Sequence, residues 1–249
     1  GHVSWDQFIG PAPMRPYHPA YIPFKWRGWW DFGTGALGDM ACHTANLAYM
    51  ACELTQPTKV EAVNVGPINS ETFPAWASIK MQFPAIESRG AIDFFWYEGK
   101  IDNKNKNWPP LDLLHGQKPS SSGSLIIGTK GTIYSSNDYG ADWKLFADGK
   151  WQGRNEVKKP EPFLPRNGRG DGGMKEEWVR AIREGKPEIA MSNFEYSANL
   201  TESILIGNLA MRAGGKFDWD TEKLKASTKE AQQYVTKKYR KGWEVAGVS

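Results

Sequence analysis

The stretch that decides the fold class is Ala77-Ser78-Ile79-Lys80-Met81-Gln82-Phe83, in which apolar and polar residues alternate strictly. Such alternation is typical of a strand with one buried face, because successive side chains of a strand point to opposite faces. Four further segments are Val/Ile-rich or aromatic and read as strands, residues 58–65, 91–97, 124–134 and 143–147. Within the third, Gly128–Gly131 reads as a hairpin turn. Strands that follow one another without intervening helices predict a mainly antiparallel sheet.

Helix signals lie on both sides of these strands. Residues 35–53 are good helix formers, with glycine only near the start. Near the C-terminus, Ser192–Glu195 and Ser227–Glu230 read as capping boxes, and Gly185 and Gly214 read as helix stops. The order of helix, strands and helices predicts an α+β fold with an open-faced, mainly antiparallel sheet and helices packed on one face.

Composition and charge narrow the functional class. The chain has 249 residues, 31 basic and 28 acidic side chains, and a net charge of +3. The basic residues are scattered, which argues against a nucleic-acid partner. No stretch reaches the ~18 apolar residues of a membrane span, so no membrane partner is expected. The two cysteines, Cys42 and Cys52, are too few for a disulfide framework and are expected to be buried thiols. The start, Gly1–Trp5, does not read as a signal peptide, which leaves cytoplasm and periplasm open.

We expect residues 1–249 to form a single domain that begins with an irregular arm, residues 1–34, rich in Pro, Tyr and Trp. Four prolines between Gly10 and Pro19 argue against a regular helix there. Two long polar connections, residues 99–123 and 149–170, are expected to be loops.

A glycine motif stands where the arm meets the predicted helix. Gly33-Thr34-Gly35-Ala36-Leu37-Gly38 matches the dinucleotide fingerprint G-x-G-x-x-G, and Glu53 lies about twenty residues on, where the fingerprint has its acid. The fingerprint also needs a buried parallel strand directly before the glycines. That place holds the charged and bulky run Lys25–Phe32. The sequence therefore argues against a dinucleotide site here, and no cofactor-binding residue is assigned in this chain.

The candidate catalytic pair is Asp39 and His43, which stand at i and i+4 on one face of the predicted helix. Histidine is the natural general base near neutral pH, and a carboxylate one turn away can fix its tautomer or hold a substrate hydroxyl. Oxidation of an alcohol needs such a base, because the hydroxyl proton must leave as the hydride departs. Spacing alone also fits an ordinary helix ion pair.

The arm supplies candidates for a sugar pocket, namely Arg27, Trp29, Trp30, Tyr17 and His18. Flat aromatic faces beside charged groups suit a sugar, which has apolar C–H faces and polar rims. The same tryptophans can simply pack the sheet. No metal site is expected from two cysteines and four histidines that do not cluster.

Several motifs resemble one family. Gly35-Ala36-Leu37-Gly38-Asp39-Met40-Ala41-Cys42-His43 resembles the glycine-rich Asp-x-x-x-His helix of the Gfo/Idh/MocA oxidoreductases, the group of glucose–fructose oxidoreductase and inositol dehydrogenase. Residues 26–35, 201–210 and 239–243 resemble a subgroup common in bacteria that degrade glycans. The resemblance covers almost the whole chain. Ala41 stands where many members carry glycine, which is a minor departure.

The resemblance implies a two-domain subunit, with an N-terminal Rossmann domain for NAD or NADP and a C-terminal α+β domain that binds substrate and mediates homo-oligomers. This chain corresponds to the second domain alone. The matched base is His43 and the matched aspartate is Asp39. The family's catalytic lysine, in a Glu-Lys-Pro motif of the first domain, is absent here, and Gly185-Lys186-Pro187 lies in the wrong place. We therefore expect the isolated chain to be inactive and to bind no cofactor.

The resemblance implies a sugar-type dehydrogenase that acts on a sugar or sugar derivative. Two other functions stay open. One is an NAD-dependent glycoside hydrolase of the same family, which uses the same domains. The other is a non-catalytic carbohydrate-binding or assembly domain, in which Asp39 and His43 are only structural.

Overall fold

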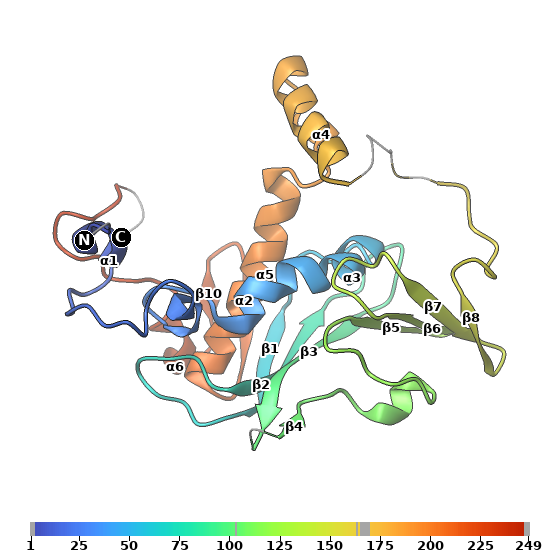
Figure 1. Ribbon diagram of the computed structural model, residues 1–249, viewed down its shortest axis with the longest axis horizontal. Helices are drawn as coiled ribbons and strands as arrows, with labels where there is room; N and C mark the ends of the chain where they lie inside the picture. The colour runs from blue at the N-terminus through green and yellow to red at the C-terminus, as the bar shows by residue number, and fades with distance from the viewer. Residues whose placement is uncertain (1–2, 103, 163, 165–169, 247–249) are drawn as a thin grey trace.

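The chain folds around a six-stranded sheet (Figure 1). The computed structural model describes residues 3–102, 104–162, 164 and 170–246. The strand order is β10-β9-β1-β2-β3-β4, and the pairings are antiparallel. The strands are β1 Lys59–Val65, β2 Trp76–Phe83, β3 Ile92–Ile101, β4 Asn105–Lys106, β9 Lys216–Asp220 and β10 Lys225–Ala226. The predicted α+β class with an antiparallel sheet is confirmed.

Strand β2 shows why the alternating pattern predicted this sheet. Ala77, Ile79, Met81 and Phe83 are buried on the face that the helices cover. Opposite Ile79 in β3 lies Trp96, which packs against the same core. The intervening polar residues therefore lie on the other face of the sheet, as the period of two requires.

Three helices cover this face of the sheet, α2 Gly35–Thr44, α3 Asn46–Ala51 and α5 Phe194–Ala213 (Figure 1). The long helix α5 lies against β1 and β2. It packs closely at Gly207, where a Cβ would lie 2.5 Å from Met81 and 2.7 Å from Leu37. Its N-cap is Asn193, whose side chain accepts from the N–H of Tyr196. The predicted box with Ser192 as cap is thus shifted by one residue.

The predicted helix 35–53 is wrong in its length, because the chain forms two helices that break at Ala45. The carbonyl oxygen of Thr44 accepts a hydrogen bond from the hydroxyl of Ser124. The hydroxyl of Thr44 donates to the carbonyl oxygen of Met40 at 2.9 Å. These contacts compete with the regular helical hydrogen bonds. The arm 1–34 is also less irregular than expected, since it holds helix α1 Trp5–Ile9 and a 3-10 turn Lys25–Gly28.

A second, four-stranded sheet follows, so the strands do not form the single sheet that we expected. Its order is β5-β6-β7-β8, with β5 Ser124–Gly128, β6 Gly131–Ser135, β7 Trp143–Ala147 and β8 Lys150–Gly153. The predicted hairpin turn at 128–131 is confirmed. The predicted loops 99–123 and 149–170 contain β4, a 3-10 turn Leu111–Leu114 and β8. Residues 103, 163 and 165–169 of these connections lie outside the described residues.

Helix α4, Gly170–Glu184, stands away from both sheets at the top of Figure 1. A 3-10 turn Pro187–Ile189 and helix α6 Lys229–Gln232 complete the described elements. Within the described part of the chain, no helix is long and apolar enough to span a membrane. Both cysteines are free thiols, but neither is buried as predicted, since Cys42 is exposed on α2 and Cys52 is half-buried.

Candidate functional site

The glycine-rich segment 33–38 shapes the turn that leads from the arm into α2. A Cβ at Gly33 would lie 2.5 Å from the backbone of Arg27, so only glycine allows this close approach. Gly35 has φ +65°, and a Cβ there would lie 2.5 Å from the ring of Phe73. No parallel strand precedes these glycines in the described chain, where Trp29 makes only an isolated antiparallel bridge to Thr72. The glycine motif is therefore not part of the strand–turn–helix unit that binds a dinucleotide.

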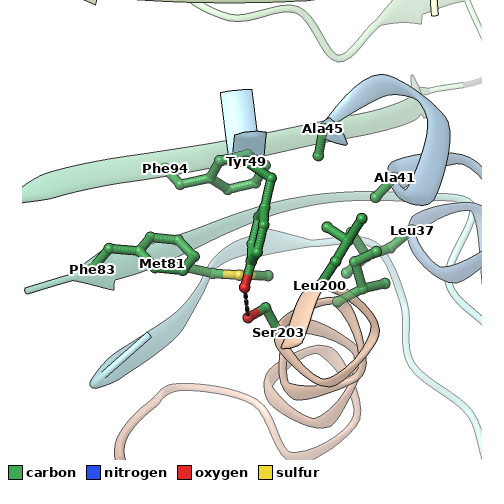
Figure 2. Close-up of a pocket in the computed structure, with 10 residues that line it drawn as sticks. Leu37, Ala41, Ala45, Tyr49, Met81, Phe83, Phe94, Leu200 and Ser203 are labelled. Carbon is green, nitrogen blue, oxygen red and sulfur yellow. Dashed lines mark hydrogen bonds between the residues drawn. The ribbon is translucent and has the colours of Figure 1, made fainter. Parts of the chain in front are cut away.

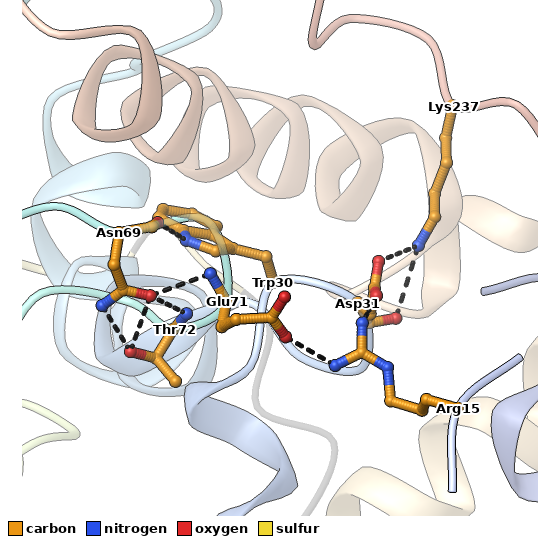
Figure 3. Close-up of polar contacts among 7 residues, drawn as sticks. All are labelled: Arg15, Trp30, Asp31, Asn69, Glu71, Thr72 and Lys237. Atoms are coloured by element: carbon orange, nitrogen blue, oxygen red, sulfur yellow. Dashed lines mark hydrogen bonds and ion pairs between the residues drawn. The ribbon is translucent and has the colours of Figure 1, made fainter. Parts of the chain in front are cut away.

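A polar network holds this turn in place (Figure 3). Asp31 receives ion pairs from Arg15 and from Lys237, the latter at 3.2 Å. Arg15 also pairs with Glu71 at 2.7 Å, which ties the arm to the loop before β2. On that loop, the backbone carbonyl oxygen of Asn69 accepts a hydrogen bond of 3.1 Å from the indole N–H of Trp30. Segments from three parts of the chain therefore fix the entry to α2.

Arg27 and Asp39 are two candidate residues that the structure brings together. The Nε atom of Arg27 lies 3.3 Å from the Asp39 carboxylate. The guanidinium also lies over the rings of Phe24, at 4.5 Å, and Trp26, at 4.8 Å. Stacking on two rings orients the planar group toward the helix. The result is an ordered cation beside a carboxylate on the outer face of α2.

His43 is exposed, one turn further along α2. Its ring meets the ring of Tyr139 edge to face, with centroids 5.5 Å apart. Tyr139 is 71% exposed and lies on the β6–β7 loop, where the side chain of Asn137 accepts from the N–H groups of Tyr139 and Ala141. Tyr139 escaped the sequence analysis, because nothing local connects it to α2. The run Asn137-Asp138-Tyr139-Gly140 signals only a turn.

Asp39 and His43 share the outer face of α2, but the structure shows no hydrogen bond between these two described residues. The Asp39 carboxylate is engaged by Arg27 instead. An imidazole at this position can exchange a proton with a bound hydroxyl, and the Arg27–Asp39 pair can hold polar groups of the same ligand.

Three other predicted pocket residues, Tyr17, His18 and Trp29, lie within the aromatic arm. Tyr17 packs edge to face on Trp5 at 5.2 Å, and Trp29 on Tyr21 at 4.6 Å. The Nδ1 atom of His18 accepts from the N–H of Ala20 at 3.1 Å.

Trp30 has a separate place, against Phe73 at 3.6 Å and below the guanidinium of Arg212 at 5.1 Å. Its ring faces are thus used in packing. Of the predicted pocket residues, Arg27 is the one that contacts the side chain of a candidate catalytic residue.

The core beneath α2 holds a small cavity of about 10 Å³ (Figure 2). The hydroxyl groups of Tyr49 and Ser203, two residues that line this cavity, share a hydrogen bond of 2.7 Å. Burial raises the pKa of Tyr49, and the Ser203 contact opposes that rise only in part. The cavity has room for about one water molecule, so it is a packing feature of the core rather than a ligand site. The outer face of α2 remains the candidate site.

Metal chemistry finds no support among the described residues, which hold no group of three or more His, Cys, Asp or Glu side chains suited to a metal ion.

Comparison with known proteins supports the family resemblance. Residues 1–87 match the family model described as the oxidoreductase family, C-terminal alpha/beta domain, of the Gfo/Idh/MocA group. This stretch holds the arm, the glycine loop, α2 and β2. Over residues 1–87 the chain is therefore similar to the C-terminal domain of the Gfo/Idh/MocA oxidoreductases.

One similar solved structure is an oxidoreductase from Agrobacterium radiobacter in complex with NAD+, L-tartaric acid and magnesium. It is 13% identical, with a TM-score of 0.42, and the match covers 74% of this chain and 49% of that one. The chain thus spans about half the length of that protein. No curated protein matches the chain.

Proposed function

We propose that this chain is the substrate-binding and catalytic half of an NAD(P)-dependent oxidoreductase that acts on a sugar or sugar derivative. The observation that carries the proposal is the family match over residues 1–87, together with the exposure of Asp39 and His43 on α2 within that stretch. An exposed imidazole beside an ordered ion pair can meet a ligand.

In the proposed reaction, His43 removes the proton of the substrate hydroxyl. Asp39, held by Arg27, accepts a hydrogen bond from a neighbouring hydroxyl and orients the ring of the sugar. Tyr17, His18, Trp29 and Trp30 are proposed to border the pocket from the arm. Of these residues, Tyr17 and Trp29 would turn an aromatic face to the apolar C–H face of the substrate.

We place no cofactor on the described residues of this chain, because the glycine motif of residues 33–38 forms the turn before α2. The proposal therefore places NAD or NADP on a separate dinucleotide-binding domain of the intact protein. The hydride acceptor comes from that domain, whereas this chain supplies the proton acceptor and the substrate pocket.

The open face of the six-stranded sheet is proposed to mediate homo-oligomers. On β3 the rings of Phe95 and Tyr97 stack at 6.2 Å, and Phe95 is 45% exposed. Lys80 and Asp93 form an ion pair at 2.8 Å beside them. Exposed aromatic rings within a polar surround are typical of a partner surface. Light scattering of the wild-type chain and of Phe95→Glu tests this, and a wild-type monomer at high concentration would contradict it.

The function is tested by two measurements. Calorimetric titration of the 249-residue chain with NAD and NADP is expected to show no binding. Micromolar affinity would contradict the proposal that the cofactor binds to a separate domain. The intact protein is then given a panel of sugars and NAD(P), and formation of reduced nicotinamide is followed. Release of an aglycone without net reduction would favour the glycoside hydrolase instead, and sugar binding without either reaction would favour a non-catalytic domain.

A further inference from the structure

We propose that Tyr139 is a substrate-binding residue, which contacts the ligand beside His43 from the second sheet. The inference rests on the proposed function, because it takes His43 as the base and a sugar or sugar derivative as the ligand. It gives the candidate site a second side. The arm leads into the start of α2, whereas the second sheet is joined to its end (Figure 1).

The β6–β7 loop leaves the second sheet beside the end of α2. The hydroxyl of Ser124, the first residue of β5, donates to the carbonyl oxygen of Thr44, the last residue of α2. The strand partner of Ser124 is Ser135, the last residue of β6. The loop that carries Tyr139 starts directly after Ser135, so its position relative to α2 is set by the sheet.

The loop is also held on both sides of Tyr139. The side-chain oxygen of Asn137 accepts from the N–H groups of Tyr139 and Ala141, at 3.0 Å and 3.1 Å. Gly140 has φ +67° and packs against α3, since a Cβ there would lie 3.1 Å from the side chain of Leu47. A side chain on a loop fixed in this way has a defined place before any ligand arrives.

Tyr139 is left in solvent by this fixed loop. Its exposed fraction is 71%, so it adds little to the core. Its hydroxyl makes no hydrogen bond within the part of the chain that the structure describes. Its ring meets the ring of His43 edge to face, with centroids 5.5 Å apart. A ligand hydroxyl that reaches the imidazole therefore lies beside an unused phenol group.

The phenol group suits a sugar in two ways. Its hydroxyl can donate to one ligand hydroxyl and accept from another, and its ring can lie against apolar C–H groups. The Arg27–Asp39 pair holds polar groups nearer the start of α2, and Tyr139 holds the part of the ligand nearest His43. Tyr139 takes no proton from the substrate, so its loss should weaken binding more than it slows the chemical step.

The placement of Tyr139 is tested in the 249-residue chain by nuclear magnetic resonance. The wild-type chain should show a nuclear Overhauser contact between the rings of Tyr139 and His43. Removal of the ring in Tyr139→Ala should shift the ring resonances of His43, whereas Tyr139→Phe keeps the ring and should leave them near their wild-type positions. Trp178→Ala, which removes a 63% exposed ring on α4, is the matched control and should shift nothing at His43.

The contact with substrate is tested in the intact protein, with the sugar that the panel described above identifies. Tyr139→Phe loses one neutral hydrogen bond and should raise KM by about threefold to tenfold, while kcat changes by less than about twofold. Tyr139→Ala should raise KM further. His43→Ala should lower kcat instead, and Trp178→Ala should leave both constants unchanged.

The inference is overturned if the two rings show no contact and Tyr139→Ala leaves the resonances of His43 in place. It is also overturned if the intact protein turns over a sugar with the same KM in both Tyr139 variants, and in that case the proposed function stands. An intact protein that neither binds nor oxidises any sugar of the panel contradicts the proposed function, and the substrate contact falls with it. The two failures are therefore distinguishable.

Discussion

Arg27 and Asp39 form an ion pair that joins the aromatic arm to the helix carrying the candidate base, with Arg27 Nε 3.3 Å from the carboxylate. The arm approaches this closely because Gly33 lets the chain pass against the backbone of Arg27. The glycine motif thus serves the geometry of the candidate site. The variants below measure separately how these residues affect stability and function.

The Arg27–Asp39 pair should matter little for stability. The two side chains are 34% and 45% exposed, and exposed ion pairs contribute about 0–1 kcal/mol. A double-mutant cycle of Arg27→Ala and Asp39→Ala, measured by urea unfolding, should give a coupling energy below about 1 kcal/mol. In the intact enzyme the same variants should weaken substrate binding. A coupling well above this bound would show a structural rather than a functional pair.

His43 should carry proton transfer in the intact enzyme. Loss of a general base typically slows turnover by ~10²–10⁴-fold, so His43→Ala should fall in this range while the protein stays folded. Asp39→Asn and His18→Ala are measured beside it. Near-full turnover of His43→Ala would refute the assignment. Loss of turnover in His18→Ala alone would place the base in the arm.

Glu98 should make stability depend on pH. Burial raises its pKa from near 4.5 to about 7, and the Trp96 and Leu37 N–H groups oppose that rise in part. The folded state then binds the proton more tightly than the unfolded state. The stabilisation is present in full below about pH 4.5 and is lost as pH rises toward 7, by about 3 kcal/mol.

The variant Glu98→Gln stays neutral at every pH, so it should lose this dependence. Its unfolding free energy relative to wild type should rise by up to about 3 kcal/mol between about pH 4.5 and about pH 8 in urea titrations. Glu61→Gln controls for the general effect of removing a negative charge. Parallel pH profiles of wild type and Glu98→Gln would show that Glu98 titrates normally.

Gly35 should tolerate no side chain. Its φ of +65° and the nearby Phe73 ring each penalise alanine, so Gly35→Ala should destabilise the chain by about 3 kcal/mol. Gly28→Ala is the control, because a Cβ there meets nothing within 4 Å. Thermal unfolding of the two variants measures the difference. Equal melting temperatures would mean that the loop relaxes freely.

Cys42 should report the charge of its neighbour Asp39. Burial and then the Asp39 carboxylate raise the pKa of this thiol, which lowers its thiolate fraction near neutral pH. Asp39→Asn should therefore speed alkylation of Cys42, by less than about tenfold. The measurement is made with Cys52→Ala in both proteins, so that one thiol is followed. Slower alkylation would contradict the charge effect.

Much of the fold could be predicted from sequence because its signals are local. The alternation in β2 depends only on the two-residue period of a strand. The glycines of segment 33–38 predict an unusual backbone turn whichever element follows them. The Asp39–His43 spacing likewise placed both side chains on one helix face. Each of these patterns is complete within a few residues, so the rest of the chain was not needed to interpret it.

Tertiary structure decided what depends on distant residues. Ser124 captures the carbonyl of Thr44 from 80 positions away and breaks the helix that local propensity continued. Tyr139 meets His43 only because the second sheet brings the β6–β7 loop to that helix. Hydrogen bonds and ring contacts require atoms within a few ångströms, and a linear pattern carries no information about which remote segments the fold will bring that close.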